Sequence, residues 1–174
     1  EPMIDVFVEN SKQYNLDDYD HILFSYHGLP QRQLKKADSC NHCLQTKDCC
    51  QNLSIKNQFC YSAQCYATTK AIVAKLGLKP DEYTTCFQSR LGKEVWIQPY
   101  TSDVIKIRSE KGDKKLLVFC PAFVSDCLET TIEIGVEYQE EFEELGGEKV
   151  DLVESLNGHP RWIKAIGELV KGEV

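Results

Sequence analysis

Short apolar runs alternate with segments of helical periodicity along most of the chain, and this alternation limits the folds that the chain can adopt. The apolar runs lie at 21–27, 83–89, 115–120 and 150–154, and the helical segments at 62–78, 101–110, 126–145 and 159–170. Such alternation is typical of a parallel sheet covered by helices on both faces. We therefore predict an α/β fold, a doubly wound, Rossmann-like parallel sheet of about four strands.

Polar residues gather where three of these predicted strands end. Tyr26 and His27 close the first run, Gln88 and Ser89 close the second, and residues 123–129 follow the third. Ligands of open α/β sheets bind beyond the carboxyl ends of the strands. A single site is therefore expected at this edge of the sheet.

His27 is the first candidate for chemistry at that edge. It ends an apolar strand and precedes Gly28 and Pro30, which favour a rigid turn that leaves the imidazole facing a cleft. Imidazole accepts protons near neutral pH and binds first-row metals. Taken alone, the residue fits a histidine that merely closes a strand better than a functional one.

Three carboxylates follow at intervals of four residues. Glu129, Glu133 and Glu137 would share one face of a helix over 126–145. A solvated charged face is the ordinary explanation for such a run. The alternative is a cation-binding series, because 121–126 places its first members at the expected cleft.

The polar segment at about 35–60 interrupts the alternation and is rich in cysteine. Five thiols lie in it: Cys40, Cys43, Cys49, Cys50 and Cys60. Clustered cysteines in a chain without a secretory signal favour metal binding over disulfides. Zinc and an iron–sulfur cluster are both consistent with the spacing, four of the five thiols would suffice, and His42 could replace one of them in a zinc site.

Composition narrows the partners and the location. The 174 residues are 42% hydrophobic, which suits one domain or a little more with a real core, and the formal net charge of -7 disfavours nucleic acid. No apolar run is long enough to span a membrane and no signal peptide is visible, so a cytoplasmic location is expected. Peripheral membrane contact stays open, and the opening Glu-Pro-Met-Ile suggests a fragment or a processed chain.

Four ordered blocks resemble the motifs of the ferrochelatase family. They are residues 24–30, residues 87–92 with 96–100, residues 120–130, and residues 156–160. The blocks occur in the family's order and cover nearly the whole chain. The resemblance is to the C-terminal half, in the bacterial type that carries an internal cysteine-rich segment.

The resemblance implies a function and roles for particular residues. The family inserts ferrous iron into protoporphyrin IX, a metal-chelatase reaction of the lyase class that ends heme biosynthesis. His27 and Glu129 match its catalytic residues, which handle pyrrole protons and iron, and Glu133 and Glu137 match an acidic lane that serves the metal. Five positions match the porphyrin pocket: Tyr26, Gln88, Ser89, Trp96 and Phe123. Cys127 stands where family members have histidine or cysteine.

The resemblance also implies a cofactor and a partner. Many members carry a [2Fe–2S] cluster, which four of the five thiols would hold here, with zinc as the alternative. Residues 1–174 then form the C-terminal domain, and the N-terminal domain, which supplies the other wall of the porphyrin pocket, is absent. We expect poor turnover from this chain alone. Other hypotheses are a cobalt or nickel tetrapyrrole chelatase, a metal or iron–sulfur module without turnover, and a flavodoxin-like regulatory domain, which the lack of a phosphate loop disfavours.

Overall fold

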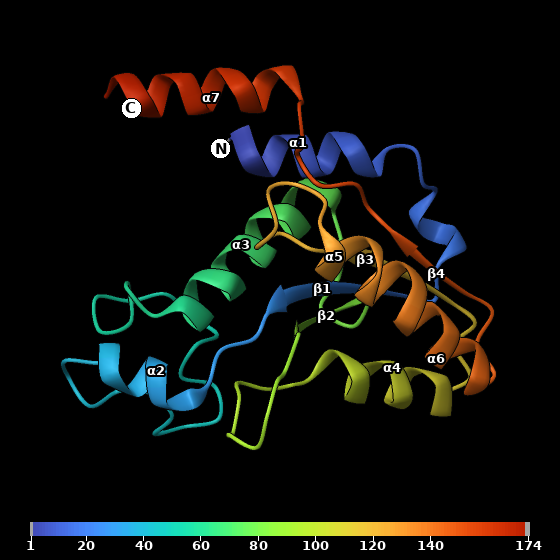
Figure 1. The fold of residues 1–174 in the computed structure, drawn as a ribbon, viewed down its shortest axis with the longest axis horizontal. Helices are drawn as coiled ribbons and strands as arrows, with labels where there is room; N and C mark the ends of the chain where they lie inside the picture. Colours follow the sequence, from blue (N-terminus) through green and yellow to red (C-terminus); the bar gives the residue numbers. More distant parts are fainter. Residues whose placement is uncertain (1, 173–174) are drawn as a thin grey trace.

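Four parallel strands form the central sheet of the computed structural model, which describes residues 2–172 (Figure 1). They are β1 (His21–His27), β2 (Tyr83–Gln88), β3 (Lys115–Phe119) and β4 (Lys149–Leu152), in the order β2-β1-β3-β4. In the register, Phe24 of β1 lies opposite Thr85 of β2 and Phe119 of β3. The predicted α/β fold with a doubly wound parallel sheet is confirmed.

Helices cover both faces of this sheet. The helices are α1 (Pro2–Ser11), α2 (Gln31–Ala37), α3 (Tyr61–Leu76), α4 (Thr101–Glu110), α5 (Leu128–Thr131), α6 (Gln139–Glu144) and α7 (Pro160–Lys171), with a 3-10 turn η1 (Leu16–Asp18) and a π-helix η2 (Glu133–Tyr138). One core cluster joins the sheet to α1 and α3, and α7 packs outside α1 (Figure 1). A second cluster joins the opposite face to α4, η2 and α6.

The consecutive apolar residues of β1 and β3 follow from this burial on both sides. Successive side chains of a strand point to opposite faces, so Leu23 enters one cluster and Phe24 the other. Both side chains are fully buried. Because neither face meets water, the apolar residues Ile22, Leu23 and Phe24 follow one another in β1 and do not alternate with polar ones.

The predicted acidic helix over 126–145 is not a continuous α-helix. Its middle turn is the π-helix η2, in which the amide of Glu137 donates to the carbonyl of Ile132 at 2.9 Å, five residues back. This correction matters for the site, because the spacing of four residues no longer stacks side chains there. The structure also adds α1 and α2, which the apolar pattern did not predict.

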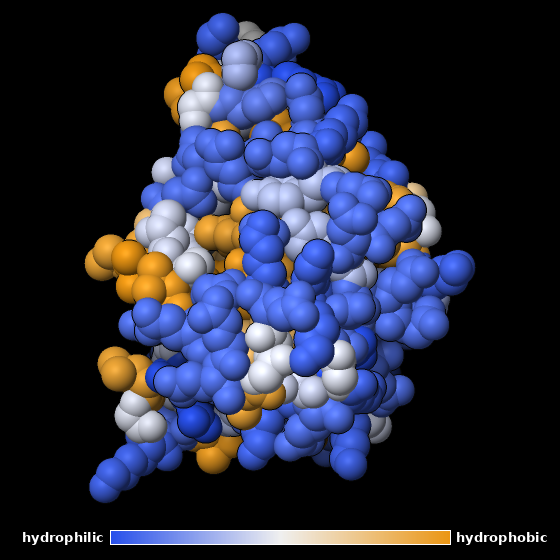
Figure 2. Space-filling view, turned by 90° about the vertical axis from the view of Figure 1, so that its right-hand side faces the viewer, coloured by the Kyte–Doolittle hydropathy of each residue, from blue (hydrophilic) through white to orange (hydrophobic). Residues whose placement is uncertain are grey.

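Residues 38–60, most of the predicted insertion, contain no helix or strand. They lie between α2 and α3, on the connection that leaves the carboxyl end of β1 (Figure 1). Among residues 2–172, no helix combines the length and apolarity needed to cross a bilayer. Figure 2 shows the side of the molecule on which β4 and α6 lie, where the surface is mainly hydrophilic and hydrophobic residues form small separate groups.

Candidate functional site

The carboxyl ends of β1, β2 and β3 bring the expected residues to one edge of the sheet. His27 lies opposite Gln88 in the register of β1 and β2. The ring of Trp96, from the loop after β2, and the ring of Phe123, from the loop after β3, each lie 6.2 Å from the imidazole, centroid to centroid. A histidine beside two aromatic rings is therefore the centre of the site.

Two hydrogen bonds fix His27 and its proton. Nδ1 lies 2.6 Å from the carbonyl oxygen of Gly28. A carbonyl can only accept, so in the neutral ring the proton sits on Nδ1 and Nε2 keeps its lone pair. The Tyr61 hydroxyl donates to the backbone carbonyl of His27 at 2.7 Å. The imidazole is thus half-buried and oriented, with Nε2 able to accept a proton or bind a metal.

Gly28 is glycine because there is no room for a side chain. A Cβ atom there would lie 3.0 Å from the carbonyl oxygen of Gln88 and 3.1 Å from Cε3 of Trp96. The Gly28 amide also donates to that same carbonyl at 2.8 Å. The turn after β1 therefore packs directly against the end of β2, which sets the place of His27 relative to Trp96.

Glu129 lies in α5 and is paired with a thiol. The hydrogen bond from the Cys127 thiol lowers the pKa of Glu129, and the charge of His27 lowers it further. Burial, followed by the hydrogen bond to Glu129, raises the pKa of the Cys127 thiol. Glu129 therefore carries a negative charge near neutral pH within electrostatic reach of His27.

The other two carboxylates of the series have different surroundings. Glu133 is half-buried and accepts hydrogen bonds from Ser89, Gln88 and Tyr138. Glu137 is exposed. The three carboxylates therefore differ: Glu129 is paired with a thiol, Glu133 is bound by protein donors, and Glu137 faces solvent.

Gln88 is almost fully buried, at 1% exposed, and it connects three elements. Its Nε2 donates to the backbone carbonyl of Glu129 at 2.6 Å and to the Glu133 carboxylate at 3.0 Å. Its Oε1 accepts from the Ser25 hydroxyl at 2.8 Å, which in turn contacts the Thr101 hydroxyl. Sequence reasoning placed Gln88 at the porphyrin pocket, but its amide is used inside the protein.

Tyr26 is the predicted site residue that the structure does not bring to the site. Its side chain is 2% exposed, lies in the core beneath α3 and bonds to the Thr69 hydroxyl at 2.9 Å. Alternation along β1 explains this, because neighbouring residues point to opposite faces. Tyr61 and Tyr138, by contrast, contact site residues and were not predicted, since no sequence spacing relates them to His27 or Glu133.

Exposed apolar side chains flank the site. Leu91 and Val95, on the loop that carries Trp96, are 80% and 60% exposed, and Leu128, beside Glu129, is 74% exposed. The Trp96 indole donates to the carbonyl of Leu91 at 3.1 Å, which holds this loop in place. A flat apolar ligand would find contact area here that the polar groups alone do not offer.

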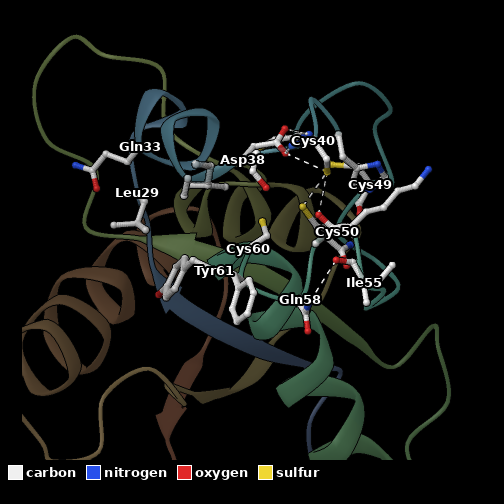
Figure 3. Close-up of a pocket in the computed structure, with 18 residues that line it drawn as sticks. Leu29, Gln33, Asp38, Cys40, Cys49, Cys50, Ile55, Gln58, Cys60 and Tyr61 are labelled. Carbon is white, nitrogen blue, oxygen red and sulfur yellow. Dashed lines mark hydrogen bonds between the residues drawn. The ribbon is translucent and has the colours of Figure 1, made fainter.

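A cavity of about 410 Å³, which His27 does not line, gathers all five cysteines of the insertion (Figure 3). His42, Leu29 and Tyr61 also line it. The Cys49 and Cys50 sulfur atoms are 3.4 Å apart, whereas the Cys40 thiol lies against Asp38 and the carbonyl of Lys56. Thiols that are spread over 21 positions of the chain are thus brought to one place.

The charge state of these thiols is uneven. A hydrogen bond from the Cys50 thiol lowers the pKa of Cys60 below its ordinary value, and the amides at the start of α3 contribute. Burial raises the pKa of Cys43 to about 11. Within residues 2–172, no three or more His, Cys, Asp or Glu side chains are already arranged around a metal position. The donor chemistry of the pocket fits a soft metal group, since thiolates are the ligands of zinc and iron–sulfur clusters.

Comparison with known proteins gives a consistent picture. The family model described as Ferrochelatase matches residues 1–174. A protein named ferrochelatase from Ectopseudomonas mendocina is 45% identical over 164 residues, 94% of this chain and 48% of its own length. Proteins of the same name from Legionella pneumophila and Pseudomonas putida are 47% and 44% identical over 94% and 95% of this chain. The chain spans about half the length of these curated relatives.

Proposed function

Because the chain belongs to the ferrochelatase family, we propose that it forms the iron-handling half of an enzyme that inserts ferrous iron into protoporphyrin IX. The observation that carries the proposal is that His27 lies beside Trp96 and Phe123 and within electrostatic reach of Glu129, at the carboxyl edge of a parallel sheet. A base and a carboxylate within electrostatic reach, beside aromatic surfaces, are the groups that this reaction needs.

The reaction exchanges two pyrrole protons for one ferrous ion. His27 presents a lone pair on Nε2, because Nδ1 is committed to the Gly28 carbonyl, so it can take a pyrrole proton or bind the incoming iron. Glu129 stays ionised beside the Cys127 thiol and stabilises positive charge near His27. Glu137 faces solvent, where it can receive a proton or the hydrated metal.

The porphyrin would pack on Trp96, Phe123 and the exposed side chains of Leu91 and Val95. One sheet edge can hold a planar ring from one side. We infer that the other wall comes from an N-terminal half, since the relatives are about twice as long. The chain alone should bind porphyrin and turn it over slowly, because positioning supplies several orders of magnitude in rate.

The test is mutation of His27 and Glu129 in enzyme that contains both halves. We expect His27→Ala and Glu129→Gln each to lower the rate of iron insertion by more than about 1000-fold, with unchanged far-UV circular dichroism. Glu110→Gln, at the exposed end of α4, is the matched control and should be neutral. Wild-type turnover in either site variant would refute the mechanism.

The substrate assignment has its own test. Parallel assays with cobalt and nickel, and with coproporphyrin III, test whether another metal or another tetrapyrrole is the better substrate. If cobalt or nickel were inserted faster than ferrous iron, that metal would be assigned as the substrate in place of iron. Preference for coproporphyrin would change the tetrapyrrole and leave the roles of His27 and Glu129 intact.

For the insertion, we propose a [2Fe–2S] cluster held by four of the five thiols Cys40, Cys43, Cys49, Cys50 and Cys60. The support is that all five line one cavity, and that Cys60 is held toward its thiolate form. A cluster would cross-link a segment that has no helix or strand of its own. Clustered thiols that bind metal are typical of reducing compartments, so a cytoplasmic location forms part of this proposal.

Metal analysis of protein purified without oxygen tests the cluster. We expect about two irons and two acid-labile sulfides per chain, with visible absorption bands. Replacing Cys43 and Cys60 together by serine should remove them, because only three of the five thiols then remain, whereas Cys65→Ala, inside α3, should keep them. One zinc without colour would replace the cluster with a structural zinc site, and metal-free protein would contradict both.

A further inference from the structure

Glu133 has more hydrogen-bond partners than any other carboxylate of the site. Oε1 accepts from the Ser89 amide at 2.7 Å and from the Tyr138 hydroxyl at 3.3 Å. Oε2 accepts from the Ser89 hydroxyl at 2.5 Å and from Nε2 of Gln88 at 3.0 Å. A carboxylate offers about four lone-pair directions, so protein donors occupy its acceptor capacity.

The backbone of Ser89 depends on this contact. Ser89 has a φ of +64°, a left-handed conformation that residues other than glycine adopt only at a cost. That conformation turns both its amide and its hydroxyl toward the Glu133 carboxylate. The hydrogen bonds compensate for the strained backbone, which ends β2 beside the turn that carries His27.

The π-helix supplies the fourth donor and moves Glu137 away. In a π-turn the residue five positions on comes close to the first, and Tyr138 is five residues after Glu133. Its hydroxyl reaches the Glu133 carboxylate, while Glu137 is exposed. The three carboxylates therefore do not form a uniform ladder.

Glu133 is also tied to the position of Glu129. Nε2 of Gln88 donates both to the Glu133 carboxylate and to the backbone carbonyl of Glu129, at 2.6 Å for the second bond. The Gln88 side chain is 1% exposed, so water does not compete for these bonds. A change at Glu133 therefore alters the amide that anchors the start of α5.

We propose that Glu133 is a positioning residue, which locks the end of β2 to the helix that carries Glu129, and that it is not an iron ligand. This changes the expectation from the sequence, in which Glu133 was a member of the metal set, and it rests on the proposed function for its kinetic consequence. Binding iron would require Glu133 to release the amide and the hydroxyl of Ser89, which donate to no other acceptor within residues 2–172, and would leave Gln88 Nε2 with the Glu129 carbonyl alone. Glu129 and Glu137 are the carboxylates left to meet the metal.

The first experiment is a double-mutant cycle that needs no activity. Glu133→Gln, Ser89→Gly and the double variant of this chain are unfolded in urea. Glycine tolerates the left-handed backbone, so Glu133→Gln should lower the folding equilibrium constant at least fivefold less in the Ser89→Gly background than in the wild type. In Glu133→Gln, the amide proton resonance of Ser89 should also move upfield, because its short charge-assisted bond is lost. Additive effects and an unmoved resonance would overturn the proposal.

The second experiment separates positioning from iron binding in enzyme that contains both halves. Glu133→Gln should lower kcat about tenfold or more and change KM for ferrous iron less than threefold, and Ser89→Gly should restore part of kcat in the double variant. Glu137→Gln, which lacks these contacts, is the matched control, and Ser89→Gly should not rescue it. A KM for iron raised tenfold or more in Glu133→Gln with kcat preserved would make Glu133 a ligand. A wild type that inserts no iron would refute the proposed function while the urea cycle still decides the role of Glu133.

Discussion

Replacing Gly28 by alanine tests the contact that joins the fold to the site. A Cβ atom at Gly28 would lie 3.0 Å from the carbonyl oxygen of Gln88 and 3.1 Å from Cε3 of Trp96. The first of these atoms is sheet backbone and the second belongs to a side chain that is 9% exposed, so neither moves freely. The turn after His27 must therefore shift by a few tenths of an ångström.

The expected cost is that of overpacking a tight interior, about 1–3 kcal/mol. The 2.8 Å hydrogen bond from the Gly28 amide to the carbonyl of Gln88 would also lengthen. With a urea slope of about 2 kcal/mol per molar, the unfolding midpoint should fall by about 0.5–1.5 M. Gly28→Ala should leave the slope unchanged, because the same surface is exposed on unfolding.

Gly158→Ala is the control, since a Cβ atom there meets no heavy atom within 4 Å. Both variants are measured by urea unfolding, followed by circular dichroism, together with the imidazole resonances of His27. We expect a midpoint within about 0.2 M of the wild type for the control and a shifted His27 signal for Gly28→Ala alone. If the two variants were equally stable and His27 did not shift, the close packing of this turn against β2 would be refuted.

Two further predictions concern His21 and Tyr61. Burial, with the charge of Arg108, lowers the His21 pKa from 6.5 to about 4, so between these values the unfolded chain binds a proton that the folded chain does not. The contribution of His21 to the free energy of unfolding should be complete above pH 6.5 and should fall by up to about 3 kcal/mol toward pH 4, at 1.36 kcal/mol per pH unit. The free energy of unfolding of His21→Gln should therefore depend less on pH than that of the wild type. Parallel curves for the two proteins would contradict this. Tyr61→Phe removes the hydroxyl that donates to the His27 carbonyl and should lower the free energy of unfolding in urea by about 1 kcal/mol. Tyr66→Phe is the control and should be neutral, because the Tyr66 hydroxyl has no hydrogen-bond partner within residues 2–172. Equal stabilities of the two variants would contradict the role of Tyr61.

The elements that carry the sheet were predictable because two-sided burial leaves a strong signal. The predicted run 21–27 is β1 as observed, and the helix predicted at 101–110 is α4. The helix predicted at 62–78 also ends close to its predicted limit, because Gly77 adopts a φ of +73° directly after α3. Convergence of the strand ends then predicted the neighbourhood of His27, Gln88 and Phe123 without any knowledge of side-chain contacts.

The roles within that neighbourhood were harder to predict. No sequence rule distinguishes a π-turn from an α-turn, so the spacing of Glu129, Glu133 and Glu137 suggested one shared face. Their actual surroundings depend on donors that come from β2, which is distant in the sequence. Tyr26 is adjacent to His27 in the sequence and was therefore expected at the site. Alternation along the strand sends its side chain into the core instead.

The cysteine pocket and the site share a boundary, and the topology explains why. In a parallel sheet, the connection that follows β1 must start at the carboxyl edge, where the site lies. The insertion occupies that connection, so its thiols gather beside the turn that carries His27. Tyr61 makes the link direct, because it lines the pocket, follows Cys60 in the chain and donates to the His27 carbonyl at 2.7 Å. Whatever group the thiols hold therefore bears on the start of α3, and through Tyr61 on the backbone of His27.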